Sequence, residues 1–223
     1  MIAKRESRKN LLETEAKVIC AEYGIPMPEY ELVSGEEEAL QASRKLGFPI
    51  VLKIVSPDII HKTEANGVIL NVTDEETVRK GFHQIIENAR SYKSGARIRG
   101  VLLQRMARSG TEVIIGGIFD PQFGQVTMFG LGGVFTEIFG DVTFRISPIE
   151  EDDAKEMIKE IRGHRLLTGY RNSLPVDEGS IVGAILAVSR MMMENPEIGQ
   201  MDLNPLIVYP NRADLVDARM ILK

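Results

Sequence analysis

The sequence has one cysteine, three histidines and no long apolar run. The single cysteine, Cys20, cannot form a disulfide within the chain, and its place in an amphipathic helical pattern favours a packed core thiol over a catalytic one. No apolar stretch of about 18 residues and no signal-peptide pattern occurs, so we predict neither a membrane span nor secretion. We therefore expect a cytoplasmic protein.

Clustered positive charge is also absent. The 27 Lys and Arg residues are outnumbered by 32 Asp and Glu residues, for a formal net charge of −5, and the two signs are interspersed. Because binding to a phosphate backbone requires grouped cations, this pattern argues against nucleic acid as a partner. A chain of 223 residues, 43% of them apolar, can bury a substantial core without disulfides.

Hydrophobic periodicity predicts an α+β protein with two lobes, residues 1–103 and 104–223, joined by a hinge near residues 104–106. Capping-box spacing from Ser34 to Glu37 and from Thr73 to Glu76 marks the starts of two helices in the first lobe. The predicted helices cover residues 11–23, 34–46, 73–92, 150–162 and 181–195. The predicted strands cover residues 50–55, 68–72, 101–103, 112–119, 125–130, 142–146, 206–209 and 213–218.

The strand at residues 50–55 and the loop after it carry the first candidates for chemistry. Lys53 interrupts this apolar strand, and a lysine there is costly to bury unless an anion meets it. His61 follows in the loop, and histidine can both accept a phosphoryl group and release it near neutral pH. Together they indicate phosphate chemistry. A surface histidine and a lysine that extends its ammonium past the sheet edge are the structural alternatives.

Glycines cluster at the end of the hairpin formed by residues 112–119 and 125–130. Gly130, Gly132 and Gly133 lie there, shortly before Glu137. Glycine lets backbone N–H groups approach an oxyanion closely, so this position favours a phosphate cradle, with a tight turn as the alternative. The segment is neither a Walker loop nor a dinucleotide fingerprint.

The C-terminal strands bring a second set of polar residues together. If they pair around the turn near Pro210 and Asn211, residues whose numbers sum to about 421 face each other, as Asn204 and Asp217 do. Asp202 lies two residues before Asn204 and therefore on the same face. Oxygen ligands and phosphates suit Mg²⁺, so these residues are candidate metal ligands, with a simple Asn-Pro turn as the alternative.

These residues, in this order, resemble the β subunit of NDP-forming acyl-CoA synthetases, the ADP-forming acetate–CoA ligases. The resemblance extends from about residue 14 to residue 222. Thr63, Glu64 and Asn66 stand where that family commonly has Ser, Asp and Gly, and residues 168–172 lack a family-typical Arg-Gly pair. The segments that carry the resemblance are Lys53-Ile54-Val55-Ser56-Pro57-Asp58-Ile59-Ile60-His61-Lys62, Asp120-Pro121-Gln122-Phe123-Gly124, Met128-Phe129-Gly130-Leu131-Gly132-Gly133, Asp202-Leu203-Asn204-Pro205 and Val216-Asp217-Ala218-Arg219.

The resemblance implies an ATP-grasp fold, in which two α+β lobes close on a nucleotide, and it assigns roles. His61 matches the family's phosphohistidine, and Asp202 matches an acidic position near the phosphoryl-transfer centre. Asn204 and Asp217 match the Mg²⁺ ligands of the related succinyl-CoA synthetase β chain. The residues that the resemblance assigns to ATP or ADP are Lys53, Gln104, Arg105, Met106, Glu112, Gly130, Gly132 and Gly133.

The reaction implied is acyl-CoA + phosphate + ADP ⇌ carboxylate + CoA + ATP. A CoA-binding α subunit would handle acyl-CoA and phosphate and pass a phosphoryl group to His61, in an expected α₂β₂ heterotetramer. One alternative is a self-contained ATP-grasp carboxylate ligase or kinase, which would not need His61. The other is a non-catalytic nucleotide-binding regulatory module, which would have no reason to keep His61, Asn204 and Asp217 together.

Overall fold

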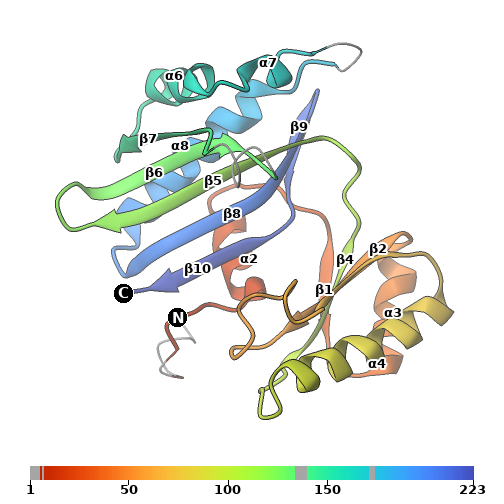
Figure 1. The fold of residues 1–223 in the computed structure, drawn as a ribbon. Coiled ribbons are helices and arrows are strands. Elements are labelled where there is room, and N and C mark those ends of the chain that lie inside the picture. Colours follow the sequence, from red (N-terminus) through yellow and green to blue (C-terminus); the bar gives the residue numbers. More distant parts are fainter. Residues whose placement is uncertain (1–5, 7, 134–139, 171–173) are drawn as a thin grey trace. The chain divides into compact units, whose positions relative to one another are not determined.

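The computed structural model describes residue 6 and residues 8–133, 140–170 and 174–223 (Figure 1). The chain forms two compact units, each built on its own sheet. Unit 1 comprises Met1–Thr14 and Pro28–Ala107, and unit 2 comprises Glu15–Met27 and Arg108–Lys223. The expected division after residue 103 lies close to the end of unit 1, but periodicity did not reveal that most of the first helix belongs to unit 2.

Unit 1 is an antiparallel sheet covered on one face by two helices. The apolar side chains between sheet and helices, such as Leu52, Ile54, Phe82 and Ile85, form a single buried core. The strand order is β1 (Tyr30–Val33), β4 (Gly100–Arg105), β2 (Ile50–Val55) and β3 (Val68–Val72). The helices are α3 (Glu36–Leu46) and α4 (Glu75–Tyr92). The strands predicted at residues 50–55 and 68–72 are confirmed.

The starts of α3 and α4 differ from the predicted capping boxes. The box from Ser34 to Glu37 is wrong, because the Ser34 N–H donates to the Glu38 carboxylate at 2.7 Å. The box of α4 exists but starts one residue later than predicted. Asp74 accepts from the Thr77 N–H at 2.8 Å, and the Asp74 N–H donates to the Thr77 hydroxyl at 3.2 Å. Several capping residues crowd both helix starts, and spacing alone does not select among them.

Strand β1 was missed in the sequence. It has four residues, Tyr30–Val33, and pairs antiparallel with β4 at the edge of the unit 1 sheet. Four residues are too few to show a clear alternation of apolar and polar side chains. The strand also follows Pro26 and Pro28, which mark a turn rather than the approach to a strand.

Unit 2 is built on a larger antiparallel sheet with α6 and α8 on one face. Helix α8 packs so closely on β5 that a Cβ added to Gly117 would lie 2.6 Å from Met192. The strand order is β10 (Ala218–Leu222), β8 (Ile198–Tyr209), β5 (Thr111–Asp120), β6 (Gly124–Leu131) and β7 (Val142–Ile146), and β9 (Arg212–Leu215) also pairs with β8. The helices of this unit are α2 (Glu13–Glu22, from Glu15 onward), α6 (Glu151–Glu160), α7 (His164–Leu167) and α8 (Glu178–Glu194). The predicted hairpin and the two long helices are confirmed.

The C-terminal ladder has the predicted register but more strand than predicted. Leu206 faces Leu215, and the ladder continues with Ala218 opposite Leu203, so that both pairs sum to 421. The strand expected at residues 206–209 is the end of the long β8, and the one expected at residues 213–218 is split into β9 and β10. The split lies opposite Pro205, which has no N–H to donate to the ladder.

Cys20 is a packed core residue, as predicted. Its side chain is fully buried and makes no disulfide. Burial raises the pKa of the Cys20 thiol to about 12, so the reactive thiolate is not formed near neutral pH. Within the part of the chain that the structure describes, no helix is long and apolar enough to cross a membrane.

Candidate functional site

The candidate nucleotide residues Lys53 and Gln104 lie on the face of the unit 1 sheet opposite α3 and α4. The register pairs Val51 with Gln104 and Lys53 with Leu102, which puts all four side chains on one face. Gln104 is 1% exposed, and among the described residues neither polar atom of its amide has a hydrogen-bond partner. Buried amides are almost always hydrogen-bonded, so the Gln104 amide agrees with the predicted nucleotide contact, which stays a prediction.

Lys53 is met by an anion, and that anion belongs to the chain itself. Its ammonium lies 2.7 Å from Oε1 of Glu13, and both side chains are buried. The second oxygen of Glu13 lies 3.0 Å from the ammonium of Lys62. An anion does accompany Lys53, but it is a carboxylate of the chain that was not recognised from the sequence. The burial of Lys53 therefore does not by itself indicate a phosphate, and its role toward the nucleotide stays a prediction.

His61 lies in the loop between β2 and β3, with its side chain 56% exposed. Its Nδ1 is 3.9 Å from Glu64. The loop is held at both sides of the histidine: the Ile59 side chain is buried in the core, and the Gly67 N–H donates to the Lys62 carbonyl at 2.7 Å. The structure thus presents an accessible imidazole on a loop anchored at Ile59 and Lys62.

Arg105 and Met106 make contacts that hold unit 1 together. The Arg105 guanidinium donates twice to the Leu46 carbonyl, at 2.9 and 2.6 Å, and so caps the end of α3. The Met106 N–H donates to the Pro49 carbonyl at 3.0 Å. These contacts give both residues a structural role beside the one that the resemblance assigns.

The glycine cluster is shaped around Glu112. The Gly132 N–H donates to the Glu112 carbonyl at 2.7 Å, and a Cβ added to Gly132 would lie 2.8 Å from that of Glu112. Gly133 has φ +61°, where glycine is favoured, and Gly130 is buried in β6 opposite Ile114. The tight turn therefore accounts for Gly132 and Gly133, and the phosphate cradle stays a prediction. Glu137 and residues 171–173 lie outside the described residues.

The candidate metal residues share one face of the unit 2 sheet. Asp202 faces Arg219 across β8 and β10, and Gly116 lies beside Asp202 on β5, so this face is the one opposite α8. The Asn204 N–H donates to the Asp217 carbonyl at 3.2 Å, which places these two residues opposite each other as the register predicted. The structure thus brings together all three predicted residues of this strand pair.

Asp202 sits in an environment that opposes its ionisation. Burial raises the pKa of its carboxyl, Asp217 raises it further, and Arg219 acts in the other direction. Among the described residues, Oδ1 of Asp202 and Nε of Arg219 are buried without a hydrogen-bond partner. Perturbed carboxyls with unsatisfied neighbours are typical of functional sites.

A family model described as "ATP-grasp domain" matches residues 2–222. The chain belongs to the ATP-grasp family. It is 49% identical over 220 residues to the β subunit of acetate–CoA ligase [ADP-forming] I from Pyrococcus furiosus, which covers 99% of this chain and 94% of that subunit. These similarities confirm the resemblance to β subunits of ADP-forming acetate–CoA ligases and the ATP-grasp fold.

Longer relatives contain the same ATP-grasp region as one part. Acetate–CoA ligase [ADP-forming] I from Archaeoglobus fulgidus is 41% identical over 221 residues, which are 96% of this chain but 32% of that ligase. The ATP-grasp chain therefore corresponds to about a third of a larger relative.

Solved structures of acetyl-coenzyme A synthetase 1 from Ca. Korarchaeum cryptofilum share this ATP-grasp architecture. One, with coenzyme A and Ca-AMPCP, superposes with a TM-score of 0.97 at 51% identity and covers 99% of this chain and 96% of that one. Another contains coenzyme A and Mg-AMPPCP, and its phosphohistidine segment points towards the nucleotide binding site; it has a TM-score of 0.87 at 49% identity, with 99% and 96% covered.

The oxygen-rich face of unit 2 fits a magnesium ion better than a transition metal. In the described part of this ATP-grasp chain, no three His, Cys, Asp or Glu side chains gather as a metal cluster. Mg²⁺ needs no such cluster, because it is held by one or two carboxylates together with water and substrate phosphates. The prediction that Asn204 and Asp217 hold Mg²⁺ therefore requires a nucleotide whose phosphates complete the shell of the ion.

Three polar residues that contact or lie beside the candidate residues of their own unit were not assigned a role from the sequence. Glu13 and Lys62 accompany Lys53, and the buried Lys17 donates to the Val216 carbonyl at 2.9 Å, just before Asp217. Glu13 and Lys17 are spaced i, i+4 on α2, and a charged pair on the buried side of an amphipathic helix is the signal that could have marked them.

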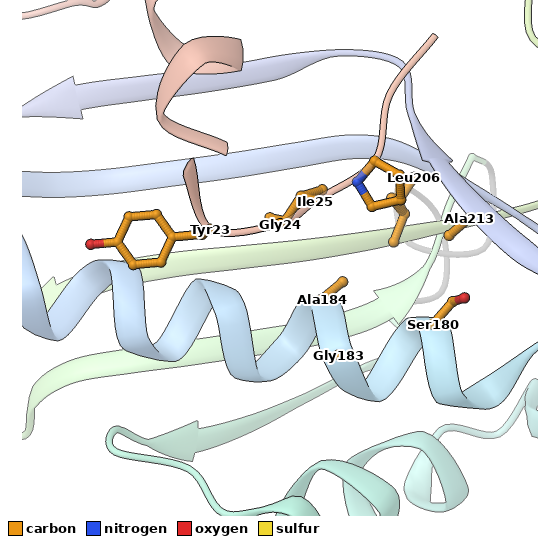
Figure 2. Close-up of a pocket in the computed structure, with 9 residues that line it drawn as sticks. Tyr23, Gly24, Ile25, Ser180, Gly183, Ala184, Leu206 and Ala213 are labelled. Atoms are coloured by element: carbon orange, nitrogen blue, oxygen red, sulfur yellow. The ribbon is translucent and has the colours of Figure 1, made fainter. Parts of the chain in front are cut away.

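A cavity of about 410 Å³ lies elsewhere in unit 2, between α8 and the chain that follows α2 (Figure 2). Tyr23, Ser180 and Ala184 are among its walls, and none of the predicted site residues lines it. Its lining carries no charged side chain, so it is unsuited to a nucleotide phosphate.

We predict that Asp202→Asn raises the thermal stability of this ATP-grasp chain near neutral pH. Burial raises the pKa of Asp202 in the folded state above that of the same carboxyl in the unfolded chain. The folded state therefore loses stability as the pH rises from the unfolded pKa to the folded pKa, because only the unfolded carboxyl ionises freely in that range. The gain in Tm should therefore shrink as the pH falls toward 4 and below, where the unfolded carboxyl is also protonated. Tm measured by calorimetry from pH 3 to 8 tests this, and an equal gain at every pH would contradict it.

Proposed function

We propose that this chain is the nucleotide-binding β subunit of an ADP-forming acetyl-CoA synthetase and that His61 is its phosphoryl carrier. The observation that supports this role best is the accessible His61 imidazole on a loop held at both sides by Ile59 and Lys62. The phosphohistidine segment of the Ca. Korarchaeum cryptofilum enzyme supports it independently. A histidine can carry a phosphoryl group reversibly because the P–N bond is readily broken again.

The proposed transfer has two steps. In the first, the P–N bond of a phosphohistidine on the α subunit breaks and a P–N bond forms to the His61 imidazole. In the second, an oxygen of the ADP β-phosphate attacks the same phosphorus, the His61 P–N bond breaks, and ATP leaves with the imidazole restored. The sum with the α-subunit chemistry is acyl-CoA + phosphate + ADP ⇌ carboxylate + CoA + ATP.

Catalysis in the second step is proposed to be positioning and charge neutralisation, as in other phosphoryl transfers. Lys53 supplies a cation on the face of the unit 1 sheet opposite α3 and α4, and Gln104 supplies a buried amide for the nucleotide base or ribose, beside Arg105 and Met106. Bound Mg²⁺ would neutralise phosphate oxygens. In unit 2, Asn204 and Asp217 would hold that ion, Asp202 would lie beside it, and the turn of Gly130, Gly132 and Gly133 near Glu112 would border the phosphates.

The α subunit is proposed as an essential partner. The Pyrococcus furiosus relative is itself a β subunit, and the Archaeoglobus fulgidus ligase is about three times as long as the region it shares with this chain. An α₂β₂ heterotetramer is the assembly that we propose, with acyl-CoA and phosphate bound by the α subunit. We propose a cytoplasmic location, because ADP and coenzyme A are metabolites of that compartment.

Phosphorylation of the purified chain by Mg²⁺ and γ-labelled ATP tests the carrier role. We expect acid-labile label on His61, mapped by mass spectrometry at neutral pH, and its transfer back to ADP. A self-contained carboxylate ligase would instead turn over with a free acid and show no labelled histidine. Labelling at another residue, or none with the α subunit present, would contradict the proposal.

A further inference from the structure

The Glu13 carboxylate lies between two lysines of unit 1, one on β2 and one in the loop that follows it. Its Oε1 lies 2.7 Å from Lys53 and its Oε2 lies 3.0 Å from Lys62. The Glu13 and Lys53 side chains are buried, whereas Lys62 is 16% exposed. Water screens the attraction between a carboxylate and an ammonium less in a buried setting than at the surface, so the Lys53–Glu13 pair is the stronger of the two and the partly exposed Lys62–Glu13 pair is the weaker.

The two lysines stand at different points of the chain relative to His61. Lys53 lies on β2, part of the rigid sheet, with Val68 and Leu102 as its neighbours across the ladder. Lys62 directly follows His61. Glu13 therefore links Lys62, the residue that follows His61, to strand β2 of the unit 1 sheet.

Other contacts hold the loop both before and after the histidine. After it, the Ala65 N–H donates to the His61 carbonyl at 3.3 Å and the Gly67 N–H donates to the Lys62 carbonyl at 2.7 Å. Asp58 and Ile59 hold the part before it. The Asp58 carboxylate accepts from the Arg97 guanidinium at 3.0 and 2.9 Å and from the Arg97 N–H at 2.8 Å, and these bonds hold the pKa of Asp58 well below its usual range. Ile59 is packed in the core. The Lys62–Glu13 pair links the residue next to His61 to α2, and it is less buried than the Lys53–Glu13 pair.

We propose that Glu13 is a positioning residue for the phosphoryl carrier. The Lys62–Glu13 ion pair, called the latch below, fixes the part of the loop next to His61 to the rest of unit 1. The inference rests on the proposed carrier function of His61. The Lys53–Glu13 pair keeps the Glu13 carboxylate in place. The Lys62–Glu13 contact can therefore break while the buried Lys53 and Glu13 still neutralise each other. A carrier histidine must be presented in a defined direction, and this contact orders the residue next to it.

The first test is hydrogen exchange of residues 56–67 in the chain alone, without nucleotide, measured by mass spectrometry. Lys62→Met removes the latch and leaves Lys53–Glu13 intact, so we expect exchange in this segment to be about tenfold faster while α3 and α4 keep wild-type rates. Glu13→Gln should speed exchange in the same segment and lower Tm as well, since it removes the negative charge that lies beside two lysines. Glu22→Gln, the same change at an exposed position of α2, is the matched control and should match wild type.

The second test is the rate of His61 phosphorylation by Mg²⁺ and ATP in single turnover. We expect Lys62→Met to slow labelling about tenfold with an unchanged half-saturating ATP concentration, and Lys62→Arg to restore the rate, because the latch orients the histidine rather than the nucleotide. Unchanged exchange in Lys62→Met overturns the latch. Faster exchange with wild-type labelling overturns the positioning role and leaves a structural ion pair. If wild-type His61 takes no label, the carrier function fails instead, and the exchange measurement still decides whether the latch orders the loop.

Discussion

The His61→Ala variant is expected to lose ATP synthesis by at least about 10⁴-fold while it still folds and binds nucleotide. Removal of a covalent carrier leaves no route for the phosphoryl group, so the loss should fall on kcat. The imidazole is half exposed and its contact with Glu64 is long, at 3.9 Å. A surface substitution of this kind changes stability by less than about 0.5 kcal/mol. The measurement is ATP formed from acetyl-CoA, phosphate and ADP by the variant mixed with the α subunit.

His83→Ala is the matched control for this variant. His83 is also exposed, pairs with Glu36 at 2.6 Å on the helix side of unit 1, and belongs to α4 rather than to the loop. It should keep wild-type synthesis. If His61→Ala also kept wild-type synthesis, the carrier role would be lost. A self-contained ligase would then be the better description if turnover with free acetate and ATP survived without the α subunit, and a regulatory module if the chain bound ATP without turnover.

The position of the His61 loop could be predicted from the sequence because the strands before and after it are two short apolar runs with polar residues between them. Residues 50–55 and 68–72 are read correctly from composition alone, and whatever lies between them must be a connection. The ladder that joins Asn204 and Asp217 was also predictable, since the turn at Pro210 and Asn211 fixes the register of every pair beyond it. Both are local inferences, made from residues close in sequence.

The counter-charge of Lys53 could not be predicted in the same way. The sequence requires an anion near a buried lysine, but Glu13 lies on α2 and reaches Lys53 only through the tertiary fold. The same limit explains why α2 was assigned to the first lobe, although Lys17 binds Val216 in unit 2. Periodicity shows which side of a helix is buried and does not show which sheet buries it.

The close approach of Gly132 to Glu112 was hidden for a related reason. A glycine cluster after a strand is compatible with a phosphate cradle and with a turn, and both need backbone without a Cβ. Only the fold shows that the Glu112 backbone occupies the space beside Gly132. The roles of these residues in nucleotide binding therefore remain predictions.

The Asp217→Ala variant is expected to lower kcat/KM for ADP by about 10²- to 10³-fold, or about 3 to 4 kcal/mol of transition-state stabilisation. If Mg²⁺ is held by few protein oxygens, loss of one carboxylate removes most of the protein's share of its shell. The strand pair should survive, because the backbone carbonyl of Asp217, which accepts from the Asn204 N–H at 3.2 Å, is unchanged. The decisive readout is nucleotide affinity by calorimetry with and without Mg²⁺. Wild-type binding should tighten when Mg²⁺ is added, and the variant should lose that gain.

Asp152→Ala separates a metal role from a general effect of lost negative charge. Asp152 lies in the first turn of α6 in the same unit, and its side chain is 95% exposed. Both variants lose one negative charge, so any difference between them in Mg²⁺-dependent nucleotide affinity comes from where the carboxylate lies. An Asp217→Ala chain that kept the full Mg²⁺-dependent gain in affinity would show that the Asn204 and Asp217 pair does not hold the ion. Asp202, whose raised pKa reflects burial beside Asp217, would then be the next carboxylate to test on this face.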